Sequence, residues 1–199
     1  MKVAPYGFTI PPCSAIPHLW FVRPADANET AVAWKIALER SDGPVALSLS
    51  RQAVPTLDRS EVAPASGLER GAYTLWESSD APDLILIATG AEVGLALDAG
   101  RKIAEDNGTS VRVVSMPCWE LFELQTAEYR DEVLPPDVKA RLSIEPGVAL
   151  GWKQWVGDNG DTLALDRFGA SAPGNEVLER LGFNVENVVA RASALLERV

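Results

Sequence analysis

Asp83-Leu-Ile-Leu-Ile-Ala-Thr-Gly-Ala-Glu-Val93 is the stretch of sequence that decides the fold. Its uninterrupted apolar run, Leu84 to Ala88, is typical of a short strand that is buried on both faces of a sheet. Good helix formers follow over 91–106, and Asn107-Gly108 is a typical C-terminal stop for a helix. A buried strand followed by a helix of this length predicts one unit of a parallel sheet.

The same alternation of apolar runs and helical stretches continues through the rest of residues 72–199. We therefore predict an α/β domain over 72–199, with a mainly parallel sheet covered by helices on both faces. The expected strands are 72–77, 83–88, 111–116, 140–145 and 161–166, and the expected helices are 91–106, 118–133 (broken), 174–181 and 185–198.

Residues 18–51 predict a partial α/β unit ahead of this domain. The pattern indicates a strand at 18–22, a helix at about 28–40 and a second strand at 45–50. Asp26 or Asn28 can cap the helix, and the two strands are expected to be parallel. Because such a unit would leave the edge of its sheet unpaired, we expect this half to be mobile, swapped or covered by another segment, while 72–199 folds independently.

Two further segments lack any periodicity. Residues 52–71 carry prolines and glycines among scattered charges and are predicted to be an interdomain linker. Residues 1–17 contain four prolines and form an unassigned N-terminal arm, which is one candidate to cover the edge of the first unit.

The composition excludes several classes of function. With 18 Lys and Arg against 28 Asp and Glu, the net charge is −10, which opposes binding to nucleic acid and to anionic membranes. No apolar stretch is long enough to span a bilayer, and the first residues carry no apolar signal core, so we expect a cytoplasmic protein. Cys13 and Cys118 are too far apart in the sequence to suggest a disulfide framework or a metal motif.

Arg51 is the first candidate site residue. It stands just past the predicted strand 45–50, at the strand end where open α/β sheets usually bind ligands, and its guanidinium suits a phosphate or carboxylate. The alternative is an ion pair with a linker carboxylate such as Asp58. Thr89 and Gly90 form a second, possible anion site at the start of helix 91–106. A tight turn without a ligand is the favoured interpretation there, because the stretch has one glycine rather than a phosphate-binding array.

Three other features have simpler structural explanations. The polar stretch 157–161 lacks the ligand spacing of a calcium loop and is predicted to be a turn. His18 is the only histidine and is interpreted as structural, so no histidine-based catalytic pair is available. Cys118 lies near a helix start that could activate it, but a buried structural thiol is favoured. The residues therefore give no catalytic constellation and no metal site.

Several motifs, in order and at family-like spacing over about residues 16–199, resemble the C-terminal part of transketolases. The motifs are Arg23-Pro-Ala-Asp-Ala-Asn-Glu-Thr30, Asp42-Gly-Pro44, Leu49-Ser-Arg-Gln52, Gly71-Ala-Tyr73, Leu86-Ile-Ala-Thr-Gly-Ala-Glu-Val93, Val111-Arg-Val-Val-Ser-Met-Pro117, Trp119-Glu-Leu-Phe122, Tyr129-Arg130, Val133-Leu-Pro135, Phe168-Gly-Ala-Ser-Ala-Pro173, Gly182-Phe183 and Glu186-Asn-Val-Val189.

The resemblance implies an activity and a domain plan. Transketolases use thiamine diphosphate with Mg²⁺ or Ca²⁺ to move a two-carbon ketol unit between sugar phosphates in the pentose phosphate pathway. Their chains have diphosphate-binding, pyrimidine-binding and C-terminal domains, and this chain resembles the end of the second and all of the third. Arg51 matches the family arginine that holds the sugar phosphate. The family also implies a homodimer, or here a partner chain that carries the missing domains.

The chain departs from the family pattern at the motifs for catalysis and cofactor binding. The metal motif, the cofactor-activating glutamate and the histidine loop of the middle domain are absent, and Met1 to Ala15 stands where that loop is expected. We therefore expect no catalytic residue, no bound cofactor or metal, and no turnover by this chain alone, which would be a split subunit, a truncated product or a separate domain. Smaller departures are Pro146 and an extra residue near Gly174-Asn175.

Two alternative functions stay open. The chain could be a non-catalytic dimerisation or anion-binding module. It could also belong to relatives that share the C-terminal domain fold, such as deoxyxylulose-phosphate synthases or a pyruvate dehydrogenase component. The segments 23–30 and 168–173 fit transketolase better.

Overall fold

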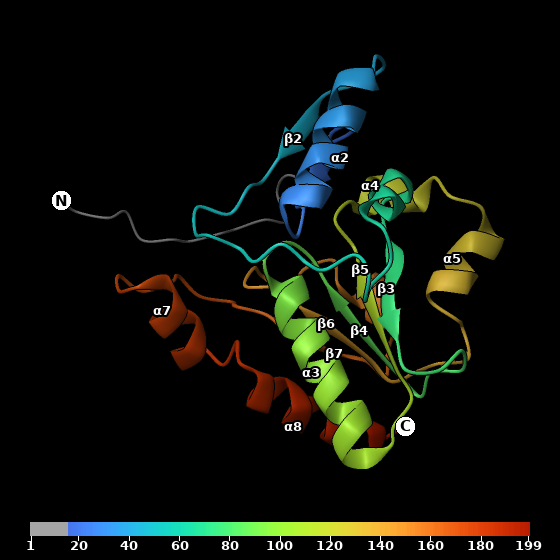
Figure 1. Cartoon of the computed structure of the whole chain (residues 1–199), viewed down its shortest axis with the longest axis vertical. Coiled ribbons are helices and arrows are strands. Elements are labelled where there is room, and N and C mark those ends of the chain that lie inside the picture. The colour runs from blue at the N-terminus through green and yellow to red at the C-terminus, as the bar shows by residue number, and fades with distance from the viewer. Residues whose placement is uncertain (1–15) are drawn as a thin grey trace.

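A five-stranded sheet forms the centre of the larger unit of the chain (Figure 1). Residues 16–199 are described by a computed structural model, and the N-terminal arm therefore lies outside the described residues except for its last two positions. The strand order is β3-β5-β4-β6-β7. The strands are β3 (Tyr73–Glu77), β4 (Leu84–Ala88), β5 (Val111–Ser115), β6 (Arg141–Ile144) and β7 (Asp161–Leu163).

The apolar run Leu84–Ala88 forms the central strand, as predicted. β4 pairs in parallel with β5 on one side and with β6 on the other, and β7 is parallel to β6. β3 pairs antiparallel with β5 at the edge of the sheet, with an irregularity between Thr74 and Trp76. The prediction of a mainly parallel α/β sheet is thus confirmed.

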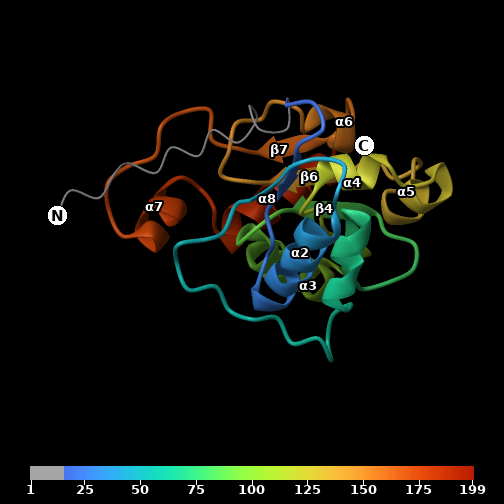
Figure 2. The ribbon, with the colours of Figure 1, turned by 90° about the horizontal axis from the view of Figure 1, so that it is seen from above.

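Alternate residues of β4 supply two separate hydrophobic cores. Leu84 and Leu86 pack into the core beneath α3 (Glu92–Asn107) and α8 (Val185–Leu196). Ile85 and Ile87 point to the other core, which is closed by α4 (Trp119–Glu123), α5 (Ala127–Val133) and α6 (Lys153–Val156). Figure 2 shows α3 and α6 on opposite sides of the sheet. Helices therefore cover both faces, and the expected break within 118–133 falls between α4 and α5.

The first unit has the predicted strand–helix–strand order. β1 (Trp20–Val22) and β2 (Val45–Leu47) pair in parallel, and α2 (Ala27–Glu39) connects them. Asp26 is the N-cap of α2, because its carboxylate accepts a hydrogen bond from the backbone N–H of Glu29. The expectation that β2 extends to residue 50 is wrong. The strand ends at Leu47, so Arg51 lies in the irregular segment that follows it.

The segment expected to be a linker is partly folded and packed. It contains the 3-10 helix η1 (Ala65–Arg70), whose Leu68 is fully buried. Leu68 shares a hydrophobic cluster with Val22 and Ile36 from the first unit and with Leu121 from α4. These contacts argue against the expected mobility of residues 18–50, because that unit is packed against the C-terminal one.

Two short helices complete the fold. α6 was missed in the sequence because a single turn leaves no periodic pattern. α7 (Gly174–Arg180) stands out from the body and contains no buried residue (Figure 1). No helix within residues 16–199 is long and apolar enough to cross a membrane.

Gly94 within α3 and Gly108 at its C-cap give a matched test of the helix geometry. A Cβ would meet no atom within 4 Å at either Gly94 or Gly108, but Gly108 has a φ of 64° and Gly94 lies inside the helix. Gly94→Ala should therefore stabilise the chain by about 0.5–1 kcal/mol, because alanine restricts the unfolded chain. Gly108→Ala should destabilise it by about 1–2 kcal/mol, because a left-handed backbone disfavours a side chain. Urea unfolding of both variants measures this difference, and equal effects would contradict it.

Candidate functional site

One pocket gathers residues that follow the carboxyl ends of four strands. Arg23 follows β1, Ser48 follows β2, Gly90 lies just after β4 and Pro146 just after β6, and all four line the pocket. Open α/β sheets usually bind ligands at this end of their strands. The pocket therefore occupies the position at which the sequence places its candidate site.

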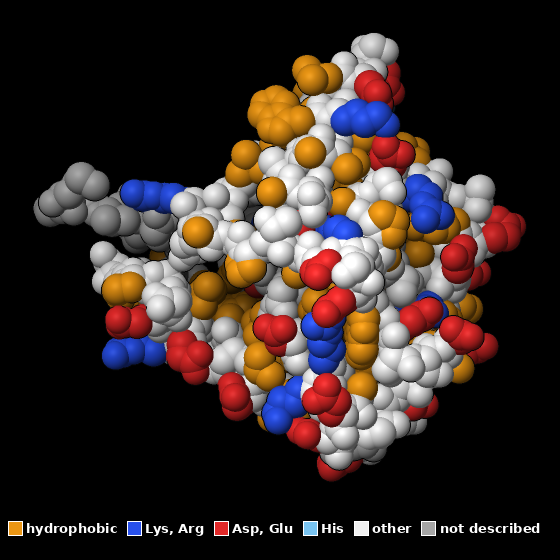
Figure 3. All heavy atoms as spheres, viewed as in Figure 1, with side chains coloured by type: hydrophobic (Ala, Val, Ile, Leu, Met, Phe, Trp, Pro, Cys, Tyr) orange, Lys and Arg blue, Asp and Glu red, His pale blue; other side chains and the backbone are white. Residues whose placement is uncertain are grey.

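The opposite wall of the pocket comes from the end of the chain. Residues 169–174 and α7 approach the segment that follows β2, and Figure 3 shows a hollow with hydrophobic side chains between the lobe of α7 and the body. The remaining lining residues are Pro24, Leu49, Ser50, Arg51, Gln52, Ala91, Glu92, Leu165, Gly169, Ala170, Ala172, Gly174, Val177, Leu178 and Leu181. The pocket thus lies between the first unit and the C-terminal unit.

Of the three candidates named from the sequence, Arg51 and Gly90 line this same pocket, whereas Thr89 is not among its lining residues. Arg51 is exposed and lies in the irregular segment beyond β2. Asp58, the alternative partner considered for Arg51, accepts hydrogen bonds from the backbone N–H and the hydroxyl of Ser60.

The polar groups at Thr89 and Gly90 already have partners within the chain. The N–H of Gly90 donates to the carbonyl oxygen of Arg23 at 3.0 Å, and the hydroxyl of Thr89 donates to the same oxygen at 3.4 Å. The φ of Gly90 is 64°, and a Cβ there would lie 2.9 Å from Nη2 of Arg23. The glycine is therefore needed for the close approach of Arg23, and these groups give no support to an anion site.

The side chain of Arg23 fills the switch point of the larger sheet. β4 continues through α3 to β5 on one side, whereas β6 lies on its other side, so the crevice between the ends of β4 and β6 is where a ligand is expected. Arg23 donates from Nη2 to Glu92 Oε2 at 3.0 Å and from Nη1 to Glu145 Oε1 at 2.6 Å. The other oxygen of Glu145 accepts from the indole N–H of Trp152 at 2.8 Å.

This cluster places two buried carboxylates around one guanidinium. Burial raises the pKa of Glu92, and the charge of Glu145 adds to that rise, although Arg23 opposes it. Burial by itself would lower the pKa of Arg23, but Glu92 and Glu145 together raise it. The guanidinium therefore stays charged. The cluster joins the end of β1 in the first unit to the ends of β4 and β6 in the C-terminal unit.

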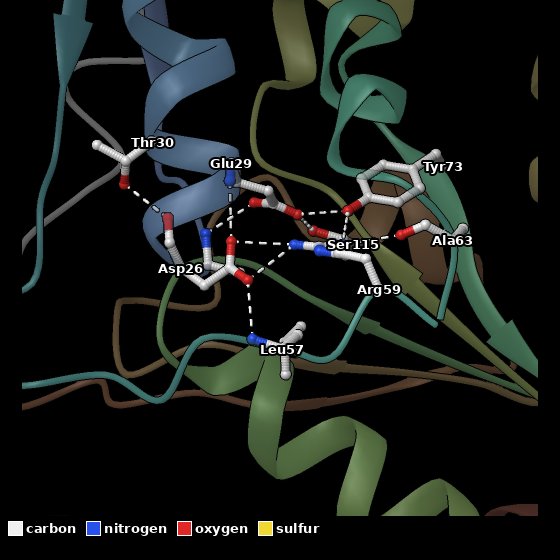
Figure 4. A network of polar contacts seen from close by, with 9 residues as sticks. Asp26, Glu29, Thr30, Leu57, Arg59, Ala63, Tyr73 and Ser115 are labelled. Atoms are coloured by element: carbon white, nitrogen blue, oxygen red, sulfur yellow. Dashed lines mark hydrogen bonds and ion pairs between the residues drawn. The ribbon is translucent and has the colours of Figure 1, made fainter. Parts of the chain in front are cut away.

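A second buried network holds the two units together around α2 (Figure 4). The Asp26 carboxylate accepts two hydrogen bonds from Nη2 of Arg59, at 3.0 and 2.9 Å, and one from the backbone N–H of Leu57 at 3.0 Å. Nη1 of Arg59 donates to the hydroxyl of Tyr73 at 3.1 Å. The segment expected to be a linker is thus fixed to both units.

Glu29 is the centre of this second network. Its Oε1 accepts from the hydroxyls of Tyr73 and Ser115, both at 2.7 Å, and its Oε2 accepts from the N–H of Ala25 at 2.7 Å. Burial raises the pKa of Glu29, although these three hydrogen bonds oppose the rise. The pKa of Tyr73 is raised far above its usual range by burial and by the charge of Glu29. This carboxyl therefore ties α2 to two strands of the larger sheet.

The remaining candidates are structural, as the sequence favoured. His18 is exposed, has a φ of 64°, and its carbonyl oxygen accepts from Nη2 of Arg40 at 2.8 Å. Cys118 is buried, and burial together with the nearby Glu120 raises the pKa of its thiol well above the usual range, which makes it unreactive. The stretch 157–161 forms a turn that leads into β7. Within residues 16–199, no group of three or more His, Cys, Asp or Glu side chains could hold a metal ion.

Sequence reasoning missed the buried charges that organise this region. Arg23-Pro24 was interpreted only as the end of a strand, and Glu29, Glu92 and Glu145 were assigned no role. Glu92 and Glu145 do carry a signal, because each is a charged residue within four positions of the end of an apolar strand. Arg23 carries the same signal, because it directly follows the apolar strand at 18–22, but nothing in the local sequence pairs it with these two carboxylates.

Family comparisons give the same domain content as the fold. The family described as "Transketolase-like TK C-terminal domain" matches residues 71–184, and the one described as "Transketolase, pyrimidine binding domain" matches residues 8–56. The chain belongs to the transketolase family. It corresponds to the C-terminal portion of a transketolase, as its motifs indicated.

Individual transketolases are similar over nearly the whole chain. One from Halalkalibacterium halodurans is 53% identical over 183 residues, which is 92% of this chain and 27% of the relative. The structure of a transketolase from Leishmania mexicana is 36% identical with a TM-score of 0.87, and covers 95% of this chain and 27% of its own. A transketolase from Pichia stipitis in complex with sedoheptulose 7-phosphate is 38% identical with a TM-score of 0.84, and covers 92% of this chain and 26% of its own. The chain thus spans about a quarter of the length of these transketolases.

Removal of Arg23 is expected to destabilise the transketolase chain strongly. Arg23→Met leaves two buried carboxylates without their cation, which should cost about 3–5 kcal/mol in urea unfolding. Arg101→Met, which removes the exposed ion pair with Glu61, is the matched control and should cost no more than about 1 kcal/mol. A cost for Arg23→Met that is as small as that of the control would show that the buried cluster does not hold the units together.

The raised pKa of Glu92 predicts how the free energy of unfolding changes with pH. Because its pKa is raised in the folded chain, its contribution to stability is present below the ordinary carboxyl pKa and is lost as the pH rises through the raised value. Glu92→Gln keeps an acceptor oxygen for Arg23 but does not titrate. The stability of Glu92→Gln relative to the wild type should therefore increase over a range of pH that starts at the ordinary carboxyl pKa of about 4 and extends upward from it. Urea unfolding across this range tests the sign, and a constant or falling difference contradicts it.

Proposed function

We propose that this chain is the C-terminal part of a thiamine-diphosphate-dependent transketolase that transfers a two-carbon ketol unit between sugar phosphates. We assign to Arg51 the contact with the phosphate of the sugar. The supporting observation is that Arg51 is exposed and lines the pocket at the carboxyl ends of the strands. Its planar guanidinium can donate two hydrogen bonds to one phosphate, which suits a substrate that is held by its charged end.

The described residues do not fit the cofactor. A diphosphate group needs a metal ion held by oxygen ligands, and residues 16–199 offer no cluster of side chains that could hold one. The buried carboxyls of Glu29, Glu92 and Glu145 are bonded to groups of this chain. We therefore derive no catalytic step here, and propose that a partner chain with the other two domains supplies the thiamine diphosphate and metal sites.

Three further proposals follow from membership of the family. The full enzyme would act in the pentose phosphate pathway, in the cytoplasm, as a dimer.

The chain alone should not turn over a ketose and an aldose phosphate when thiamine diphosphate and Mg²⁺ are added. Turnover by the purified chain alone would overturn the need for a partner. The alternative of a non-catalytic module, with an anion site at Thr89 and Gly90, predicts dimerisation without any sugar-phosphate binding that depends on Arg51.

The role of Arg51 can be tested in an active enzyme. Residues 16–199 can replace the matching quarter of the Halalkalibacterium halodurans transketolase, which is 53% identical to them. In this chimera, Arg51→Gln should raise the KM for a phosphorylated substrate about 10–100-fold, because it removes charged hydrogen bonds to the phosphate. The KM for an unphosphorylated ketose such as erythrulose should stay unchanged, and steady-state kinetics measures both.

Arg167→Gln is the matched control for this substitution. Arg167 is also exposed, but it does not line the pocket. It should leave both KM values unchanged. If Arg51→Gln raised both KM values equally, or neither of them, Arg51 would not be the phosphate contact.

A further inference from the structure

The walls of the pocket are more apolar than a sugar phosphate requires. The two apolar sides face each other across the boundary between the units, and Figure 3 shows hydrophobic side chains lining the hollow. The apolar lining residues are Pro24, Leu49, Ala91, Pro146, Leu165, Ala170, Ala172, Val177, Leu178 and Leu181. Ligand pockets commonly combine such walls with a few polar groups that fix orientation.

The charged residues of the lining favour an anion. The charge of Arg23 is balanced by Glu92 and Glu145, so the preference of the lining for an anion depends on Arg51. Arg23 is held at the bottom of the crevice by its ion pairs with Glu92 and Glu145, whereas Arg51 is exposed. An anionic group is therefore expected at the Arg51 end, with an apolar body directed toward α7.

The pocket exists only where the two units meet. Gln52 lies in the segment after β2 that leads away from the first unit, Gly174 begins α7, and a Cβ on Gly174 would collide with the side-chain amide of Gln52. The glycine thus permits the close approach that closes one side of the pocket. A molecule bound here would contact both units and would stabilise their packing by an amount that grows with its concentration relative to its Kd.

We propose that this pocket binds a compact amphipathic anion, namely a phosphate or carboxylate attached to an apolar body the size of one aromatic ring. The inference goes beyond the role of Arg51 toward sugar phosphates, because the apolar side of the lining offers contacts that the hydroxyl groups of a sugar do not use. The two proposals share Arg51, so the amphipathic anion should compete with the sugar phosphate. In every other respect the two proposals are tested independently.

The test is a calorimetric titration of the full 199-residue chain. Phenyl phosphate and phenylacetate are the probes, and they distinguish a phosphate from a carboxylate as the anionic group. Inorganic phosphate is the reference without an apolar body. We expect at least one aromatic anion to bind about tenfold or more tightly than inorganic phosphate, because burial of one ring contributes more than about 1.4 kcal/mol.

Two substitutions of Val177 examine the apolar wall. Val177 is half-buried and lines the pocket on α7, which has no buried residue, so the fold should tolerate changes there. Val177→Asp places a negative charge in the wall, and Val177→Trp fills the space without any charge. Both should weaken the aromatic anion about tenfold or more. Asn175→Asp adds the same charge on the same helix outside the pocket, and should leave binding unchanged.

Each outcome decides the inference. Tighter binding of an aromatic anion that is lost in both Val177 variants and kept in Asn175→Asp supports it. Binding no tighter than that of inorganic phosphate overturns it, as does binding that survives in both Val177 variants. If Arg51→Gln abolishes binding of all anions equally while the Val177 variants bind as the wild type, the pocket claim fails and the sugar-phosphate role of Arg51 stands. If instead the chimera shows no phosphate-specific effect of Arg51→Gln, the proposed function fails and the pocket claim is still decided by Val177.

Discussion

The ion pairs of Arg23 with Glu92 and Glu145 are the contact on which the arrangement of the two units depends. Two carboxylates are buried at the ends of adjacent strands in the larger sheet, and buried charges are costly unless a counter-charge is close. That counter-charge comes from the first unit. The C-terminal unit is therefore electrostatically incomplete by itself, which weakens the expectation that residues 72–199 fold independently.

The polar character of this interface has a structural consequence. An apolar contact tolerates small shifts, whereas hydrogen-bonded charges are satisfied in one geometry only. Glu29 accepts from Tyr73 and Ser115, and Asp26 accepts from Arg59, so α2 is fixed against the larger sheet at two further points. The segment after β2, which carries Arg51, is thereby held at a defined position next to α3 and α7. Positioning of the candidate phosphate contact thus depends on groups that never touch the phosphate.

Local sequence predicted the elements but not the contacts that join them. The run Leu84–Ala88, the cap at Asp26 and the stop at Gly108 were predictable, because each depends on neighbouring residues only. Arg23 lies 69 and 122 positions from its two partners, and no local pattern encodes such a pairing. The end of β2 was misplaced because Ser48 to Ser50 continues the alternation of the strand. Arg51 lies at the carboxyl ends of the strands, as predicted, because that prediction needed only the order of the elements.

The position of Arg23 also explains why the larger sheet offers no ligand site of its own at the switch point. The crevice between β4 and β6 is the usual place for a ligand in such a sheet, and here an arginine of the same chain fills it. The start of α3, which could have bound an anion, donates instead to the carbonyl oxygen of that arginine. The proposed ligand site is instead the pocket that the first unit and α7 form together. Because Arg51 comes from the first unit, the proposed phosphate contact depends on the packing of the two units that Arg23 maintains.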